Sequence, residues 1–387
     1  MKRLLAYGLT CLAVVPLNGC GVGAEHLGPI LDPRALSAPS AHPQIRVIDG
    51  YKLSIFAEGL GSPRHMTRRG NEVWVAERTG QRVLVLRDLD GDGYAEDRVT
   101  AASGYFKMHG IDYFKGWFYF STQSTVYRFR DDNQDRVADA APEAIITDLP
   151  TEGHTTRTVR VNPFNEKLYV HIGSSSNLDI EPAPRATIRQ YNLDGTKGRE
   201  FASGLRNAVG VSFHPKTGEM WVVNSGWDNL GDLLPHECMW RVADGQFFGW
   251  PYAYSHNGVV MPDPTFGPSN PAKVAATKVA DWEFGAHTTP LGITFWRGTR
   301  WGVETDGAAF VAFHGSYVPF NPVGYEVGRV TFDPVTLRPV GFTTMVTNFR
   351  QGNATPVGRP VDVLQFGSAL LISDDYNGKI YRLDKLS

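Results

Sequence analysis

A strand-pair pattern that recurs along the chain constrains its fold more than any other feature of the sequence. In each copy a turn containing Gly or Asn precedes a β-rich strand, and a second strand returns. The copies are spaced roughly 45 to 60 residues apart, except across one long gap, and this period is typical of a propeller. The strand pairs are 70–76 with 83–86, 116–120 with 126–129, 167–170 with 188–191, 218–223 with 239–242, 309–312 with 327–330, and 369–372 with 379–383. The sequence therefore predicts an all-β fold, a six-bladed β-propeller.

Two further segments complete this architecture. The run from Tyr51 to Phe56 has the composition of a strand and is expected to supply the outer strand of the last blade, which closes the ring. The long gap, about Phe247 to Thr289, is rich in Pro, aromatic and His residues. We interpret it as an excursion above the ring that shapes a pocket, although a covering loop without function is the alternative.

The composition suits a globular body with many tight turns. The chain of 387 residues holds 41 Gly and 25 Pro, scattered among short apolar runs, and 42% of its residues are hydrophobic. The formal net charge is −2, and no run of Lys or Arg reaches the density of a nucleic-acid-binding patch. A nucleic-acid partner is therefore not expected.

The N-terminus predicts export. Lys2 and Arg3 precede an apolar stretch, residues 4–17, that is too short to span a bilayer as a mature helix. The sequence Leu17-Asn18-Gly19-Cys20 resembles a bacterial lipobox, which predicts cleavage before Cys20 and acylation of its thiol; an ordinary signal peptide is the alternative. The expected organisation is a signal peptide at 1–20, a flexible tether at 21–45 and the propeller at 46–387. The protein would then be lipid-anchored, on the periplasmic side of the outer membrane or at the cell surface.

Cysteine usage agrees with an exported body without internal disulfides. Of the three cysteines, Cys11 leaves with the signal and Cys20 is lipidated, so Cys238 remains. We expect Cys238 to be a buried apolar residue.

An acidic loop after the first strand pair predicts a calcium site. Asp88, Asp90 and Asp92 alternate with other residues, Gly93 stands at the sixth position and Tyr94 follows. This spacing converges oxygen atoms on a hard cation, as in the first half of an EF-hand loop. The twelfth position is Val99, so the loop is not a full EF-hand, and an acidic turn is the alternative. A degenerate echo, with Arg in place of Gly, follows at 131–139.

Several residues with catalytic or binding chemistry precede the first strands of the units. His154, in Gly153-His154-Thr155-Thr156-Arg157-Thr158, is a candidate general base near one mouth of the channel. Arg206 and Asn207 precede the fourth unit, Arg359 the sixth and Arg64 the first. Arginines converging on one channel favour an anionic ligand between them. The alternatives are a hydrogen-bonded structural His and arginines paired with acids. The sequence contains no Rossmann fingerprint, nucleophile elbow or zinc helix motif.

The ordered motifs resemble those of the soluble glucose and sorbosone dehydrogenases that use pyrroloquinoline quinone (PQQ). The similarity extends over about 59–383. The segments that carry it are 59–64, the loop at 88–96, 153–158 with 173–177, 204–207, 231–235 with 248–252, 290–295, 314–317 with 324–327, and 358–361.

The resemblance implies a function and a site. It implies PQQ-dependent oxidation of an aldose or aldehyde by hydride transfer to the quinone, with His154 as the base and Arg206 steadying the charge on the quinone oxygen. Asn207, Arg359, Arg64 and His314 are implied cofactor contacts. A second calcium, held near Trp227 and Asp228, is implied to act as a Lewis acid. Gly153 stands where the better-studied glucose enzymes carry an acid, with Glu152 beside it.

Two other functions stay open at the level of sequence. One is a non-enzymatic propeller that binds a saccharide or a protein partner at the channel mouth. The other is a calcium-dependent, lactonase-like hydrolase, which needs carboxylates in the channel. The electron acceptor is not identified by any motif.

Overall fold

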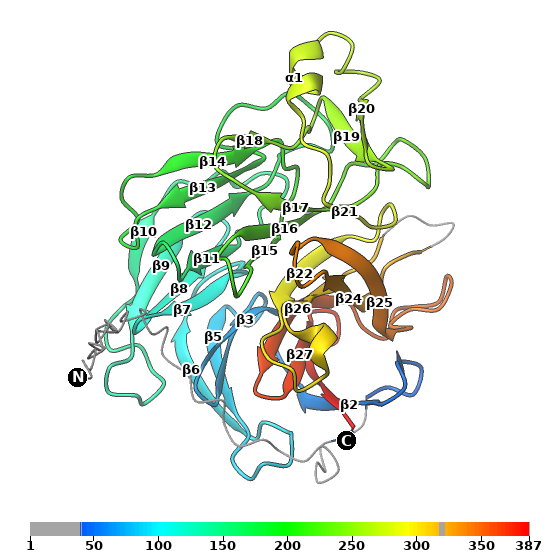
Figure 1. The fold of residues 1–387 in the computed structure, drawn as a ribbon. Coiled ribbons are helices and arrows are strands. Elements are labelled where there is room, and N and C mark those ends of the chain that lie inside the picture. Colours follow the sequence, from blue (N-terminus) through cyan, green and yellow to red (C-terminus); the bar gives the residue numbers. More distant parts are fainter. Residues whose placement is uncertain (1–38, 40, 317–321, 387) are drawn as a thin grey trace, which may run out of the picture.

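The computed structural model describes residues 39, 41–316 and 322–386, and in these residues six β-sheets follow one another round the molecule in chain order (Figure 1). The first two blades, from inner to outer strand, are β3 (Pro63–Arg69), β4 (Glu72–Glu77), β5 (Arg82–Arg87) and β6 (Asp97–Ser103), then β7 (Ile111–Phe114), β8 (Trp117–Ser121), β9 (Val126–Arg130) and β10 (Glu143–Ile146). The third and fourth are β11 (Val159–Asn162), β12 (Lys167–Ile172), β13 (Thr187–Tyr191) and β14 (Arg199–Ser203), then β15 (Gly210–Phe213), β16 (Met220–Asn224), β17 (Cys238–Val242) and β21 (Trp282–Glu283). The last two are β22 (Pro290–Phe295), β23 (Ala309–Phe313), β24 (Glu326–Phe332), β25 (Pro339–Thr347) and β1 (Arg46–Val47), then β26 (Pro360–Phe366), β27 (Ala369–Asp374), β28 (Lys379–Lys385) and β2 (Tyr51–Ala57).

The ring closes as the sequence predicts. Each innermost strand contacts the innermost strand of the next blade, and β26 of the last blade contacts β3 of the first. The outer strand of the last blade is β2, which pairs antiparallel with β28, so Leu53 faces Leu383 across the sheet. The predictions of a six-bladed propeller and of the closing strand are therefore confirmed.

The core lies between neighbouring blades. Trp74 of the first blade stacks on Phe118 of the second with ring centroids 3.8 Å apart, and Trp221 of the fourth meets Phe332 of the fifth edge to face at 5.0 Å. Such residues are common in strands because a pleated face holds large and β-branched side chains in fixed rotamers. Each aromatic side chain that is fully buried in this way contributes about 1.5–3 kcal/mol. Cys238 is buried too, as predicted.

The long excursion extends outside the ring before the chain returns to it. It begins with β18 (Gln246–Phe247), which runs parallel to β14, and continues into the hairpin of β19 (Ala253–His256) and β20 (Val259–Pro262). The short helix α1 (Pro271–Ala276) follows, and the chain then re-enters the fourth blade as its outer strand β21. Figure 1 shows the hairpin and α1 projecting together from one side of the propeller.

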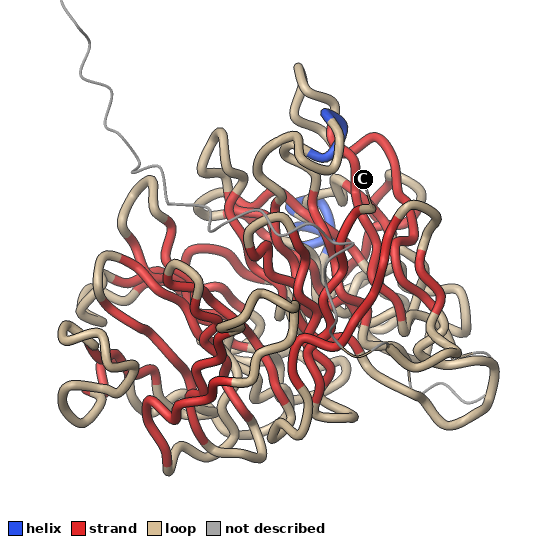
Figure 2. The backbone as a smooth tube through the Cα atoms, turned by 90° about the horizontal axis from the view of Figure 1, so that it is seen from below, coloured by secondary structure: helices blue, strands red, loops and turns tan. Residues whose placement is uncertain are grey.

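Helix contributes little to the described part of the chain. Besides α1 there is a single-turn 3₁₀ helix at Val303–Thr305, and strands dominate the tube drawing in Figure 2. None of the helices within the described ranges is long and apolar enough to cross a membrane. The predicted signal peptide, Cys20 and most of the predicted tether lie outside the described residues. The last tether residue, Ile45, is buried in a core cluster.

Candidate functional site

The channel mouth at which the innermost strands begin gathers most of the residues singled out in the sequence. In each blade the second strand runs antiparallel to the first, so the loop after the second strand lies at the same mouth. Arg64, His154, Arg206 and Arg359 stand at or just before innermost strands, and Asp228 and His314 follow second strands. Segments far apart in the sequence therefore present polar groups to one face of the ring.

His154 is held in a defined tautomer. Its Nδ1 lies 3.1 Å from the carbonyl oxygen of Ser174 and 3.0 Å from the Ser174 hydroxyl. Because a carbonyl oxygen only accepts hydrogen bonds, Nδ1 carries the proton and Nε2 has the free electron pair. Burial and, to a smaller extent, the neighbouring Arg206 together lower the pKa of His154 to about 4. His154 is therefore a neutral imidazole at physiological pH, able to accept a proton at Nε2.

The structure explains why Gly153 stands before His154, where the better-studied glucose enzymes carry an acid. Its φ is +66°, and a Cβ atom there would lie 2.2 Å from the carbonyl oxygen of Ser175. Any side chain at this position would clash with backbone, so the acid that precedes the base in those enzymes has no room here.

The acid whose charge acts most strongly on the base comes from elsewhere in the chain. Glu152 is 85% exposed and pairs with Arg185. Glu181 instead accepts hydrogen bonds from the backbone amides of Ser175 and Ser176, and its charge acts on His154. Burial alone would raise the pKa of Glu181, but these donors lower it, so the carboxylate stays ionised.

Arg206 is buried and oriented by Asn177, which lies in the motif at 173–177 but was not predicted as a site residue. Its Nε donates to the backbone carbonyl of Asn177 at 2.9 Å, and Nη2 donates to the Asn177 Oδ1 at 2.8 Å. Burial lowers the pKa of Arg206 from its usual value, but a guanidinium remains charged. Asn177 follows the second strand of the third blade, and that position is the signal that could have identified it.

Trp227 and Asp228, the predicted calcium segment, lie beside Arg206. The backbone amide of Asp228 donates to Asn177 Oδ1 at 3.1 Å, and the Asp228 carboxylate lies 3.3 Å from Nδ1 of His287. Trp227 is buried. The segment offers a carboxylate and adjacent backbone carbonyls, which are the hard oxygen ligands that calcium takes.

A second polar cluster joins the first, fifth and sixth blades. Asp375 pairs with Arg64 and lies 3.0 Å from Nε2 of His314. Although burial alone would raise the pKa of Asp375, Arg64 and His314 hold it well below its usual range. Arg359 donates to the backbone carbonyls of His314 and Gly315. Three of the predicted cofactor contacts, Arg64, His314 and Arg359, are thus brought together.

Several buried polar atoms at this mouth have no hydrogen-bond partner among the described residues, and two of them lie close to Arg64 and His154. One is Nη1 of Arg78, whose pKa is lowered by burial and by the neighbouring Arg64. The other is Oδ1 of Asn207, which lies close to His154: a Cβ added to Gly173 would meet both residues. The buried guanidinium nitrogen needs an acceptor and the buried amide oxygen needs a donor, so a ligand with both an anionic group and a hydrogen-bond donor would satisfy them. Arg78 was not singled out by the sequence analysis.

The Asp88 loop lies at the opposite end of the first blade. The loop joins β5 to β6. Because β5 runs parallel to β3, the loop lies at the end of the blade where β3 finishes, away from the mouth where β3 begins. Asp88 accepts hydrogen bonds from the amides of Gly91 and Gly93, which shape the loop. Carboxylate oxygens of Asp88, Asp90 and Glu96 lie within 4.8 Å of one another. Glu96 thus joins the predicted set, while Asp92 accepts from the Tyr94 amide.

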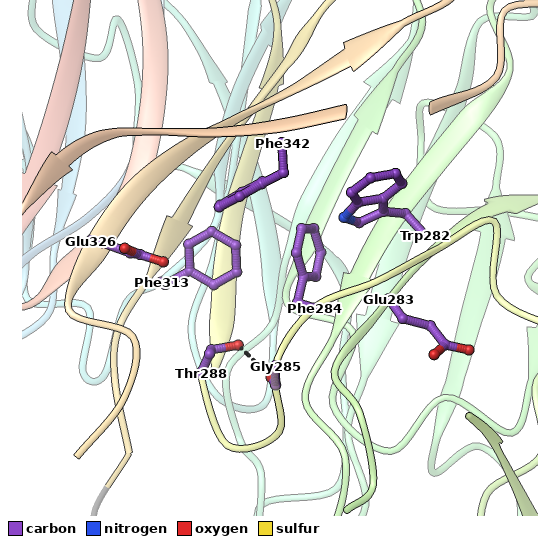
Figure 3. Close-up of a pocket in the computed structure, with 8 residues that line it drawn as sticks. All are labelled: Trp282, Glu283, Phe284, Gly285, Thr288, Phe313, Glu326 and Phe342. Carbon is purple, nitrogen blue, oxygen red and sulfur yellow. Dashed lines mark hydrogen bonds between the residues drawn. The ribbon is translucent and has the colours of Figure 1, made fainter. Parts of the chain in front are cut away.

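One pocket opens between the fourth and fifth blades. It has a volume of about 170 Å³, and its lining residues are Trp282, Glu283, Phe284, Gly285, Thr288, Phe313, Glu326 and Phe342. Figure 3 shows the aromatic rings side by side, with Glu326 next to Phe313 and the Glu283 carboxylate turned away from the rings. Burial raises the pKa of Glu326. The end of the predicted excursion, up to Thr288, therefore does line a pocket.

Comparisons with known proteins agree with this fold. A family model described as TrAA12-like matches residues 45–235 and 272–385. An uncharacterised protein of Borreliella burgdorferi is 28% identical over 353 residues, which cover 88% of this chain and 90% of that protein. A pyrroloquinoline quinone-dependent pyranose dehydrogenase of Coprinopsis cinerea is 23% identical over 415 residues, covering 90% of this chain and 56% of that protein, so the chain spans about half of that relative's length.

A solved structure shows the shared fold. The calcium structure of a Trichoderma reesei member of Carbohydrate-Active Enzymes Family AA12 superposes with a TM-score of 0.79 at 21% identity, covering 90% of this chain and 98% of that one.

Proposed function

Because the chain belongs to the TrAA12-like family, we propose that it oxidises a sugar with pyrroloquinoline quinone as the acceptor. The relative named as a PQQ-dependent pyranose dehydrogenase supports this proposal, as do the predicted site residues at one channel mouth. The substrate class that we propose is an aldose or a small aldehyde.

The residues at the mouth fit PQQ. The cofactor carries three carboxylates, and the mouth offers the guanidinium groups of Arg64, Arg78, Arg206 and Arg359. The unpartnered Nη1 of Arg78 is the observation that carries this fit, since a buried guanidinium nitrogen without an acceptor is costly. When bound, PQQ supplies a two-electron acceptor, and calcium near Trp227 and Asp228 supplies a Lewis acid.

Two residues of the chain carry the proposed chemistry. His154 accepts the proton of the substrate hydroxyl at Nε2, because Ser174 fixes the proton on Nδ1. Arg206 stabilises negative charge that develops beside His154, and Asn177 fixes the orientation of its guanidinium. Glu181 acts through His154 as a positioning residue, because it holds the backbone of Ser175 and Ser176 beside the Ser174 acceptor.

We further propose that the body is attached to a membrane through lipid on Cys20 and faces the periplasm or the cell surface. The lipobox-like sequence supports this. Metabolic labelling with a radioactive fatty acid tests it: label should enter the wild-type protein and be absent from Cys20→Ala.

PQQ binding followed by dye reduction tests the enzymatic proposal. The body expressed without its first twenty residues is titrated with PQQ in the presence of calcium, and turnover is then measured with a panel of aldoses and aldehydes. We expect saturable binding by the wild type, weaker binding by Arg78→Gln, and binding without turnover by His154→Gln. The exposed Val335→Ala, in the turn between β24 and β25 at the opposite end of the fifth blade, serves as the control.

Two results would count against the proposal. Full turnover by His154→Gln would show that another group is the base. Absence of PQQ binding by the wild type would overturn the enzymatic reading and favour a propeller that binds a saccharide or a protein partner at the mouth.

A further inference from the structure

Three residues that the proposed PQQ site does not use bring ligand-competent atoms together. His236 precedes β17, His256 ends β19, and Glu283 ends β21. One ligand atom from each lies within 4.8 Å of the others. We propose that His236, His256 and Glu283 bind a divalent transition-metal ion, and that Zn²⁺ is the ion their chemistry favours.

The donor set selects the class of metal. Two imidazoles and one carboxylate are ligands of borderline character, which suit zinc and its neighbours in the first transition row. Calcium and magnesium prefer sites made of oxygen atoms alone. Three protein ligands leave a fourth tetrahedral position for water, and the side chains of His236 and Glu283 are 22% and 13% exposed, so the site is reached from solvent.

The carboxylate is held in place by the tip of the hairpin. Asn257 and Gly258 both have positive φ angles and form the two-residue turn between β19 and β20. The amides of both residues donate to the carboxylate of Glu283, as does the Ser255 hydroxyl at 2.7 Å. Such outer hydrogen bonds orient metal ligands.

One of the histidines has an unused nitrogen. Nδ1 of His256 is buried and, among the described residues, has no hydrogen-bond partner. The rings of His236 and His256 meet edge to face with centroids 4.6 Å apart, and Nδ1 of His236 lies 2.8 Å from Glu283. A metal ion would give the buried nitrogen a partner. It would also hold the two imidazole rings together more strongly than their edge-to-face contact, which contributes little free energy.

The proposed site lies where the excursion meets the fourth blade. His236 and His256 fall between the two segments matched by the family model, 45–235 and 272–385, so the family does not account for them. Because His256 lies on the hairpin and the other two ligands lie beside β17 and on β21, a bound ion would fasten the hairpin to the fourth blade.

Cobalt titration tests the site. Metal-stripped protein is titrated with Co²⁺, whose visible absorption reports four-coordinate binding, and Zn²⁺ is then added as competitor. We expect one equivalent of Co²⁺ that zinc displaces, and affinity at least about tenfold weaker in His256→Ala and His236→Ala. Zinc should raise the melting temperature of the wild type and leave that of His256→Ala unchanged. The exposed His42→Ala is the control and should bind as the wild type does.

A variant that should restore metal binding separates loss of a ligand from misfolding. Because cysteine is also a ligand of these metals, His256→Cys should recover binding and add a sulfur-to-cobalt charge-transfer band. Absence of saturable Co²⁺ binding by the wild type overturns the proposal, as does wild-type affinity in both alanine variants. PQQ binding is measured on the same proteins and should not change in His256→Ala, so the two proposals fail independently.

Discussion

At the scale of single residues, the channel buries ionisable side chains that most folds leave in water. His65 and His109 are fully buried, with ring centroids 4.2 Å apart, and burial lowers the pKa of both well below the usual value. The Asp362 carboxylate accepts a hydrogen bond from the backbone amide of Met66 at 2.8 Å and lies 3.6 Å from the guanidinium of Arg160. The innermost strands bring these groups together from different blades, so their titration should be visible in both activity and stability.

The pH dependence of activity should report His154. Since burial and Arg206 lower the pKa of His154 to about 4, the neutral base is populated above that pH, and kcat/KM should fall as the pH drops through about 4. His154→Gln should lower turnover by about 10²–10⁴-fold across the range. Dye-reduction rates at constant ionic strength measure both effects. An acid limb near the ordinary histidine pKa of 6.5 would contradict the assignment.

The pH dependence of stability should report Asp362. Burial raises its pKa from 3.8 to about 6, against the opposing charges of Arg160 and Arg64. A folded-state pKa above the unfolded value stabilises the protein fully below about pH 3.8, and this contribution is lost as the pH rises through about 6. Two pKa units correspond to about 3 kcal/mol.

Asp362→Asn separates this effect from other titrations. The amide still accepts from Met66 but does not titrate, so the variant should gain about 3 kcal/mol of unfolding free energy relative to the wild type between about pH 4 and about pH 7. Denaturant unfolding at several pH values measures the difference. The free energy of unfolding of the exposed control Asp49→Asn should change with pH as that of the wild type does. If the difference between Asp362→Asn and the wild type did not change with pH, the Asp362 carboxyl would have an ordinary pKa.

At the scale of elements, two similar acidic loops have different electrostatic surroundings. In the loop after β5, oxygen atoms of Asp88, Asp90 and Glu96 converge. In the loop after β9, Nη2 of Arg69 lies 2.6 Å from the buried carboxylate of Asp131. A guanidinium thus pairs directly with Asp131 in the second loop, whereas in the first loop three carboxylates converge and Arg382 acts on Asp88 only through its charge.

Calcium should therefore stabilise only the first of these loops. We expect chelation to lower the melting temperature of the wild type. Asp90→Asn with Glu96→Gln should reduce this response to the part that the proposed calcium near Trp227 and Asp228 contributes, while leaving the Asp88 hydrogen bonds to the loop amides intact. Asp139→Asn in the second loop is the matched control and should keep the response. Differential scanning calorimetry with and without calcium measures these shifts in melting temperature. A shift in the doubly substituted protein equal to that of the wild type would refute the calcium site at this loop.

What the sequence predicted and what it missed follow from how local each signal is. Strand pairs such as 70–76 with 83–86 are visible because alternation and turn residues lie within one short window. The pairing of Arg64 with Asp375 joins positions 311 residues apart, and no local pattern announces it. Arg78 and Glu181 were missed for the same reason. Glu96 was missed because the EF-hand template places its acid at the twelfth position, which is Val99 here.

At the scale of the whole molecule, the first strands of the chain complete blades formed by its last third. β1 extends the fifth blade and β2 the sixth. Phe56 of β2 is fully buried, meets Phe366 edge to face at 5.8 Å, and belongs to the cluster that includes Met66 and Val75 of the first blade. It therefore sits where the ring closes, between the last blade and the first.

Phe56→Ala should weaken the ring as a whole. A cavity of this kind costs about 3–5 kcal/mol, and since Phe56 joins two blades the unfolding transition should move to lower denaturant while remaining single. Intrinsic fluorescence and circular dichroism, followed together, measure this. The exposed Phe106→Ala should have almost no effect. Two separated transitions in Phe56→Ala would show that the last blade unfolds on its own.

The closing strand also sets an order of events during synthesis. Tyr51 pairs with Lys385, so a strand made early finds its partner only when the chain as far as Lys385 has left the ribosome. Until then the backbone groups of β2 and the edge of β27 have no native neighbour, and closing so long a loop is slow. A ribosome that stalls before Lys379 would release a chain with an open sheet edge, and such an edge adds strands from other chains.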